Sequence, residues 1–314
     1  MALIYKTTSE LLSYAECPQK HQFGYQMQLS PKRPRERLEE GTILHRVMQE
    51  YYNTREPALC LAKLNRLLDG YRARFEPWAR DKADRDAIEL EIVRLRAVVR
   101  AYLELVAPRD YERYAFAGNE IEFAFELWPA RVFAGKIDSL FIERESGAFV
   151  LVDHKYQKTN TGEDRFVKYQ PFWYLIGLER DPALGIRCRR IVYNLVKHPE
   201  LKLTKEVRTL EALEDRIYED VKMRLDWYVN RPPAIETSEG MLASAERIMR
   251  VLYRRSMEGP EDRYAVPSRQ CDWMCAFKPP CFDPTLSQEE FHKLYFIRER
   301  AHPELSVGPE EKAA

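Results

Sequence analysis

Apolar residues recur every three or four positions along much of the chain, a period typical of amphipathic helices. Residues 38–52 carry this pattern through Ile43, Leu44, Val47, Met48 and Tyr51, and residues 57–107 carry it through a longer helical insert. The same period predicts a long helix over residues 204–229 and another over residues 238–255.

Two shorter helices are predicted from capping and proline position. Residues 8–25 form the first, with Thr8 or Ser9 as its cap. The second follows a polar loop that ends at Asp164; it starts near Val167, because Pro171 is tolerated only in a first helical turn.

Between the helical stretches the period changes to two, which is typical of half-buried strands. Residues 120–127, 132–142 and 148–153 show this alternation, and the polar turn 143–147 has hairpin length. We therefore expect three strands in an antiparallel meander, followed by a further apolar strand at 191–196.

Composition narrows the class of protein. The chain has 314 residues, 45% of them hydrophobic, and its 50 basic residues balance 50 acidic ones. Because the mean hydropathy is −0.53 and no apolar run approaches the ~18 residues that cross a bilayer, we expect no membrane insertion. Residues 1–8 lack the basic and apolar regions of a secretory signal, so we expect a cytoplasmic location.

Zero net charge provides no general attraction for nucleic acid, so any DNA contact must come from local basic groups. Three groups qualify, although solvated surface charge explains each of them equally well. They are Lys32, Arg33, Arg35 and Arg37; Arg187, Arg189 and Arg190; and Arg247, Arg250, Arg254 and Arg255.

Two acidic residues and a lysine lie on the second and third predicted strands. Asp138 ends the sequence Gly135-Lys136-Ile137-Asp138, and Asp153, His154 and Lys155 end the third strand. Pairing of these strands as a hairpin brings the two carboxylates and the ammonium group together. Since side chains alternate along a strand, Asp153 and Lys155 share a face and His154 points to the other side.

This grouping suits a divalent cation, because a carboxylate after an apolar run is costly to bury without a compensating charge. Two carboxylates with open water positions favour Mg²⁺ or Mn²⁺, which take a substrate phosphate as a further ligand. Lys155 beside the metal would position the attacking water or neutralise the phosphorane, as phosphodiester hydrolysis requires. A surface Asp-x-Lys ion pair is the simpler alternative.

Five short motifs occur in order along the chain: Cys17-Pro18, Gly41-x-x-x-His45, Gly135-Lys136-Ile137-Asp138, Asp153-His154-Lys155 and Gln170-x-x-x-Tyr174. Together they resemble the RecB-type branch of the PD-(D/E)XK nuclease superfamily, over roughly residues 7–56 and 118–281. The resemblance implies an α/β fold with a restriction-endonuclease-like core, in which a central mixed sheet is flanked by helices.

The resemblance also implies a role for each motif. His45, Asp138 and Asp153 would bind the metal with the main-chain carbonyl of His154; Lys155 would be the catalytic lysine; Gln170 and Tyr174 would contact DNA. The residues agree with these roles, because a neutral imidazole is a natural third ligand and residues four apart share a helix face. A core histidine and a structural helix-face pair are the alternatives.

Two details of the acidic set concern this chain in particular. Many family members carry Glu at the position of Asp153. The Asp side chain of this chain is one carbon shorter. The family's further acidic residue, upstream of the Gly-x-x-Asp strand, corresponds to Glu120 or Glu122, and the sequence does not choose between them.

Three cysteines form a second candidate site, Cys271, Cys275 and Cys281. Cys17 completes a set of four by resemblance to the iron-sulfur members of the same nuclease branch. Four thiolates fit a 4Fe-4S cluster or zinc, and the lack of paired C-x-x-C knuckles favours the cluster; free thiols are the alternative. The cluster would act as a staple between distant segments. The remaining two, expected to be small buried hydrophobes, are Cys60 and Cys188.

We therefore predict a metal-dependent DNA exonuclease of DNA recombination, repair or CRISPR adaptation, acting on DNA ends or single strands. It resembles the single-chain iron-sulfur exonucleases, including CRISPR-associated exonuclease family four, and a recombination or CRISPR-adaptation protein is a candidate partner. Three alternatives stay open. They are a single-strand or structure-selective endonuclease, a catalytically silent module that binds DNA ends, and a zinc-stapled structural protein.

Five segments are predicted along the chain: an N-terminal segment with the first cysteine and the metal-binding helix (1–56), the helical insert (57–117), the nuclease core (118–235), a C-terminal cluster-binding region (236–283) and a charged tail (284–314).

Overall fold

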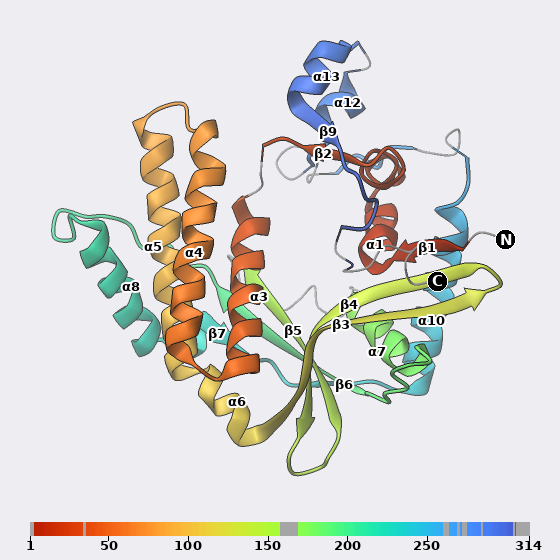
Figure 1. Ribbon diagram of the computed structural model, residues 1–314, viewed down its shortest axis with the longest axis horizontal. Coiled ribbons are helices and arrows are strands. Elements are labelled where there is room, and N and C mark those ends of the chain that lie inside the picture. The colour runs from red at the N-terminus through yellow and green to blue at the C-terminus, as the bar shows by residue number, and fades with distance from the viewer. Residues whose placement is uncertain are drawn as a thin grey trace.

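A mixed β-sheet lies at the centre of the molecule, with helices on both of its faces (Figure 1). The computed structural model describes residues 3–33, 36–157, 169–259, 264–268, 271, 275–283, 285–303 and 305, without the side chains of 36–38. The expected α/β class with a mixed sheet flanked by helices is confirmed.

The first half of the chain contains most of the helices that cover one face of the sheet. Its elements are β1 (Ile4–Thr7), α1 (Thr8–Glu16), α2 (Pro18–His21), a π-helical turn η1 (Gln22–Gln26), β2 (Leu29–Pro31), α3 (Glu36–Thr54), α4 (Pro57–Phe75), a 3₁₀ turn η2 (Glu76–Trp78), α5 (Lys82–Leu105) and α6 (Ala107–Arg113).

The second half contributes most of the strands. Its elements are β3 (Tyr114–Trp128), β4 (Arg131–Glu143), β5 (Phe149–Gln157), α7 (Gln170–Arg180), β6 (Arg190–Lys197), α8 (Leu210–Met223), α9 (Leu225–Tyr228), β7 (Val229–Asn230), β8 (Ile235–Glu236), α10 (Glu239–Arg255), α12 (Lys278–Phe282), α13 (Gln288–Leu294) and β9 (Tyr295–Ile297).

Strands β3, β4 and β5 form the predicted antiparallel meander, and β6 continues the sheet parallel to β5. Strand β1 also joins the sheet, parallel to the first residues of β4. The short β7 and β8 pair with β6. The turn between β4 and β5 contains Gly147 at φ +69°, a conformation that glycine adopts without a steric penalty.

On one side of β4, the neighbouring strand differs between the two halves of β4. Beside it, β1 pairs with residues 131–134 and β5 pairs with residues 139–142. Residues 135–138 lie between these two ladders, where β5 turns away from β4 and continues along β6. This fork leaves a gap in the sheet at the Gly135–Asp138 motif.

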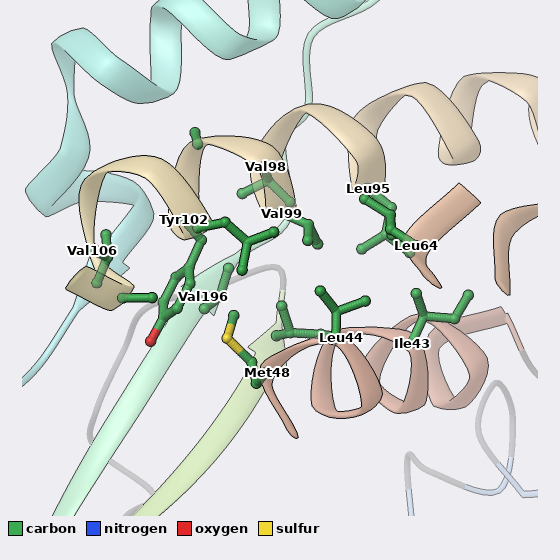
Figure 2. Packing of buried hydrophobic residues seen from close by; sticks show 14 of the residues in the cluster. Ile43, Leu44, Met48, Leu64, Leu95, Val98, Val99, Tyr102, Val106 and Val196 are labelled. Carbon is green, nitrogen blue, oxygen red and sulfur yellow. The ribbon is translucent and has the colours of Figure 1, made fainter. Parts of the chain in front are cut away.

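One face of the sheet packs against α3, α4, α5 and α8. Figure 2 shows the centre of this layer, where Met48 of α3 and Tyr102 of α5 lie close to Val196 of β6. These side chains are almost completely buried. The helical period of the sequence is therefore explained by one shared core, which fixes α3 on the sheet.

The opposite face packs against α1, α7 and α10. Its core includes Leu11, Trp173 and Met249, all of them inaccessible to solvent, and the Trp173 indole donates to the carbonyl of Ala245 at 3.0 Å. The ring of Phe123 lies in this layer between Gly135 and Gly177; a Cβ on either glycine would come within 2.4 Å of it. The two glycines therefore set how closely α7 approaches the sheet.

A smaller third core joins the beginning and the end of the chain. Strand β9 pairs antiparallel with β2, and Phe23, Leu29, Phe277 and Tyr295 pack together around this pair (Figure 1). The sequence predicted a charged tail here. The apolar Tyr295 within it instead closes a core that includes residues near Cys275 and Cys281.

Helix boundaries differ from the prediction at several places. The N-cap of α1 is Thr7, whose Oγ1 accepts the Glu10 amide, and residues 8–25 form three short pieces rather than one helix. The helix predicted over 204–229 begins only at Leu210, since the Thr204 hydroxyl accepts nearby backbone amides in a turn that competes with helix formation.

The same helix is interrupted at Arg224, whose ψ of 43° is not helical. Pro171 lies in the first turn of α7 as predicted, whereas Asp164 and Val167 lie outside the described residues. In the described part of the chain, no helix combines the length and apolar character that crossing a bilayer requires.

Candidate active site

Three acidic residues lie side by side across three neighbouring strands. The β4–β5 register pairs Ser139 with Val152, so Asp138 and Asp153 are the next facing positions, at the fork where the ladder ends. On the other side of β4, the register with β3 places Glu120 opposite Asp138. The expected proximity of Asp138 and Asp153 therefore follows from the observed strand pairing.

Glu120, and not Glu122, is the upstream carboxylate that meets Asp138. Ligand atoms of His45, Glu120 and Asp138 all lie within 4.8 Å of one another. Glu120 has φ +50°, an unusual conformation for a residue with a side chain, and its carboxylate forms an ion pair with Lys136 at 2.5 Å. The pattern of alternation gives no signal for this local distortion, which is why the sequence left the choice open.

His45 reaches the site from α3. Its Nδ1 lies 3.5 Å from Asp138 Oδ1, and its Nε2 donates to the main-chain carbonyl of His154 at 2.9 Å. The amide of His154 donates to Asp138 Oδ2 at 3.1 Å. The backbone of His154 thus links His45 to Asp138.

The imidazole of His154 points to the other side of the sheet, as the alternation predicts. It contacts Asn194 Nδ2 at 2.8 Å and Ser139 Oγ at 3.3 Å. Burial and nearby cations lower the pKa of His154 well below its usual value, so the ring is neutral. Asn194 and Arg231 extend this network to Asp110. The sequence did not predict the network, because its contacts join elements that are distant along the chain.

Asp153 and Lys155 lie on the same face of β5. Lys155 Nζ donates to Asp153 Oδ1 at 2.9 Å, whereas Asp153 Oδ2 is buried without a hydrogen-bond partner in the structure. Burial disfavours the charge on Lys155, but Asp153 and Asp138 outweigh it and raise the pKa of the amine above its usual value. Lys155 is therefore a cation. Asp153 does not belong to the group of three around His45.

Burial also acts on the two remaining groups of the site. Desolvation raises the pKa of Asp138, and the charge of Asp153 adds to it, although His45 acts in the opposite direction. Tyr174 of α7 is buried, and burial with Asp138 raises the pKa of its hydroxyl above the usual value. Gln170 Nε2 donates to the Tyr174 hydroxyl at 2.6 Å, so the predicted pair is in contact.

A cavity of about 570 Å³ opens beside these residues. Its wall is formed by α1, α3, β3, β4, α7 and the C-terminal segment, and includes His45, Asp138, Tyr174 and Pro303. Arg46 and Lys136 also line it and were not singled out from the sequence, although Lys136 lies within the Gly135–Asp138 motif.

The donor atoms fit a hard divalent cation. Oxygen ligands dominate, as Mg²⁺ and Mn²⁺ prefer, and His45 Nδ1, 3.5 Å from Asp138 Oδ1, adds a nitrogen donor while Nε2 donates to the His154 carbonyl. The partnerless Asp153 Oδ2 is a buried oxygen of the kind that a cation satisfies. The arrangement can bind Mg²⁺ or Mn²⁺ and present a cation to a phosphate.

The four cysteines predicted as a site come from both ends of the described chain. The Val266 amide donates to Cys17 Sγ and the Ser268 amide to Cys271 Sγ, both at 3.4 Å. Burial, with the charges of the other three thiols, raises the pKa of Cys281. Among the described residues, no three of these sulfurs lie within 4.8 Å of one another. Zinc would bring its thiolates to about 3.8 Å, so the arrangement is not a formed zinc site, and it does not show a 4Fe-4S cluster.

The other two cysteines, Cys60 and Cys188, are buried as expected. Part of the cysteine-rich stretch, including Trp273, lies outside the described residues.

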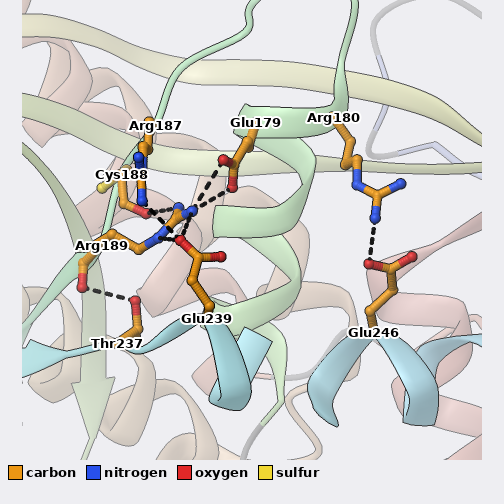
Figure 3. Close-up of polar contacts among 8 residues, drawn as sticks. All are labelled: Glu179, Arg180, Arg187, Cys188, Arg189, Thr237, Glu239 and Glu246. Atoms are coloured by element: carbon orange, nitrogen blue, oxygen red, sulfur yellow. Dashed lines mark hydrogen bonds and ion pairs between the residues drawn. The ribbon is translucent and has the colours of Figure 1, made fainter. Parts of the chain in front are cut away.

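Of the basic groups predicted as DNA contacts, the second is fully paired with acidic residues. Figure 3 shows Arg189 between Glu179 and Glu239, with Arg187 bound to the same Glu239. Arg190 pairs with Glu143 and Glu236, and Arg250 with Glu246. Arg35 and the side chain of Arg37 lie outside the described residues. The ion pairs of the second group fit the alternative of solvated surface charge, and its role as a DNA patch stays a prediction.

Comparison with known proteins agrees with this geometry. The sequence matches the PD-(D/E)XK nuclease superfamily over residues 7–282, a range that contains the three acidic residues, Lys155 and all four candidate cysteines. No curated protein matches the chain.

Proposed function

The chain belongs to the PD-(D/E)XK nuclease superfamily and is by that membership a metal-dependent nuclease, and we propose that it is a DNA exonuclease. One observation carries the proposal. The β4–β5 pairing makes Asp138 and Asp153 facing neighbours at the fork, His45 and Asp138 line one cavity, and Lys155 is the cation beside Asp153.

Asp138, Asp153 Oδ2, His45 and the His154 carbonyl would hold Mg²⁺ or Mn²⁺, and Glu120 would add a further carboxylate. A bound ion of this class activates water and offsets the charge that develops on the phosphate. The protein's part is to keep these ligands ionised and in place, which the backbone contacts of His154 support.

Lys155 is suited to act as a positive charge rather than as a base. Its raised pKa keeps it protonated at neutral pH, so it can donate hydrogen bonds to a phosphate oxygen or to the attacking water. Its contact with Asp153 fixes the ammonium group beside the carboxylate that we assign to the metal. This supports a role in stabilising the negative transition state.

Gln170 and Tyr174 would orient the DNA backbone. Because Gln170 donates to the Tyr174 oxygen, the hydroxyl proton of Tyr174 is available for another acceptor. Its raised pKa keeps that proton on the oxygen at neutral pH. Since Tyr174 lines the cavity beside Asp138, a phosphate oxygen is the acceptor that we assign to it.

The form of the cavity favours an exonuclease over an endonuclease. Helices α1 and α3 line two sides, and Pro303 of the C-terminal segment adds to the wall. A strand end enters a cavity that is walled on these sides more readily than the middle of a continuous strand does. The competing assignment, a single-strand or structure-selective endonuclease, requires the same residues.

End-labelled linear DNA and circular single-stranded DNA, each with Mg²⁺ or Mn²⁺, distinguish the two activities. We expect digestion of the linear substrate alone; cleavage of the circle would identify an endonuclease. Lys155→Ala should abolish cleavage, whereas Lys63→Ala is a matched control, because Lys63 is similarly half-exposed and ion-paired but contacts Glu50. Binding to DNA ends without any cleavage would indicate the silent module.

We assign a 4Fe-4S cluster to Cys17, Cys271, Cys275 and Cys281 as part of this proposal. The other three thiols help to raise the pKa of Cys281, which supports this assignment. A cluster with several irons also spaces its cysteine ligands more widely than a single zinc ion does. Protein prepared without oxygen should be brown, with broad absorbance near 400 nm. A colourless protein that contains zinc would support the alternative structural role.

We place the activity in DNA recombination, repair or CRISPR adaptation, where free DNA ends arise. The proposed requirement of the enzyme for a DNA end supports a role in these pathways. Binding partners from those pathways should increase digestion of linear DNA and leave circular DNA intact.

A further inference from the structure

A second group of ligand-type side chains lies on the other face of the sheet from Asp153. Glu40 of α3, Glu91 of α5 and His198, which directly follows β6, have ligand atoms that all lie within 4.8 Å of one another. Glu40 is 5% exposed and His198 is 4% exposed. Three elements that are distant in sequence thus bring two carboxylates and an imidazole together, with Glu40 and His198 buried and the Glu91 side chain 22% exposed.

Cations already face one of the two carboxylates. His198 Nε2 contacts Glu91 Oε2, and Arg94 Nη1 donates to Glu91 Oε1 at 2.5 Å. Burial tends to raise the pKa of Glu91, but these contacts outweigh it and lower that pKa. Arg94 also donates to the Leu201 carbonyl at 2.7 Å, which holds the guanidinium to one side of the group. Glu91 is therefore ionised at neutral pH.

The hydroxyl of Tyr156 adds an independent observation. Its oxygen is buried and has no hydrogen-bond partner in the structure, and its ring lies 5.7 Å from that of His198. The charges of Glu40 and Glu91 act on it and help burial to raise its pKa well above the usual value. A buried polar group without a partner is destabilising, so this hydroxyl indicates a bound group beside the carboxylates.

We propose that Glu40, Glu91 and His198 bind a zinc ion. Imidazole nitrogen and carboxylate oxygen are both zinc ligands, and water would complete the coordination. The bound water would provide the acceptor that Tyr156 lacks. Zinc is favoured over manganese at a site with an imidazole, because affinity for such ligands rises along the first-row metals.

This ion would act on structure, and it is separate from the catalytic metal proposed above. It would join the helical insert, through α5, to the end of β6 and to α3, the helix that carries His45. Glu40 is on α3 one and a half turns before His45. Zinc would thereby fix the helix that presents His45 to the active-site cavity.

Zinc content and thermal stability test the proposal on the full chain. Protein treated with chelator and then equilibrated with zinc is analysed for zinc per chain, with iron counted separately, and melted with and without zinc. Glu40→Gln keeps the shape of the side chain and should retain the fold, but it should weaken zinc binding at least tenfold and reduce the zinc-induced rise in melting temperature. His198→Asn is the second variant.

His45→Ala is the matched control, since it removes a ligand of the catalytic site alone. It should keep the zinc that Glu40→Gln loses. Zinc content and zinc-induced stabilisation equal to wild type in both Glu40→Gln and His198→Asn would overturn the proposal. The group would then be a buried ion-pair network in which an ordered water satisfies Tyr156.

Discussion

Replacing Gly177 by alanine tests how closely α7 must pack against the sheet. The added Cβ would lie 2.3 Å from Cδ2 and 2.4 Å from Cε2 of Phe123, and Gly135 confines the same ring from its other side. The ring is 1% exposed and cannot turn away. Overpacking of this kind costs about 1–3 kcal/mol, and the better helix propensity of alanine returns about 0.5–1 kcal/mol. We expect a net loss of up to about 2.5 kcal/mol in the free energy of unfolding.

Gly70→Ala on α4 is the matched control, because nothing lies within 4 Å of a Cβ there. It should gain about 0.5–1 kcal/mol from helix propensity alone. Thermal melts separate the two variants, since 1 kcal/mol corresponds to about 1.5 °C at about 2.1 cal/mol/K per residue over 314 residues. Displacement of α7 should also move Tyr174, so kcat/KM should fall in Gly177→Ala and stay unchanged in Gly70→Ala. A Gly177→Ala protein that melts at or above the wild-type temperature would refute the packing argument.

Further predictions concern the two metal-binding regions. Lys155→Met should lower kcat at least a hundredfold with unchanged folding by circular dichroism; retained turnover would remove the ammonium group from the mechanism. Without metal, Asp138→Asn should melt above wild type at pH 7 and level with it near pH 4, because a raised carboxyl pKa makes the wild type lose stability as pH rises; equal melting at both values would contradict this. Tyr174→Phe should weaken kcat/KM about tenfold, as loss of one hydrogen bond to a charged group predicts. Cys275→Ala should be colourless and melt lower than wild type, and an unchanged melt would argue against a staple.

Local patterns predicted much of the fold and the centre of the site. Strand alternation and a turn of hairpin length were sufficient to place Asp138 opposite Asp153, because register in a hairpin depends on neighbouring residues. The same alternation correctly turned the His154 ring away from Lys155. Helix periods located α3 and the insert because each helix buries one apolar face in a shared core.

Local patterns did not predict the contacts between distant segments. Glu120 was not distinguished from Glu122, since its position depends on a backbone distortion within β3. The meeting of Glu40 with His198 depends on how the insert packs on the sheet, which no local period encodes. The pairing of β9 with β2 was missed because three-residue strands are too short to show alternation.

The clasp between β2 and β9 has a consequence for synthesis on the ribosome. Strand β2 must wait for Tyr295–Ile297 to emerge, which takes roughly 10–50 s at about 5–20 residues per second. During the later part of that interval the aspartates of β4 and β5 are already made, while β2 still lacks its partner strand. Nascent chains therefore cannot form the β2–β9 pair until β9 has been made, so the nuclease matures only after its central sheet and both aspartates have been synthesised.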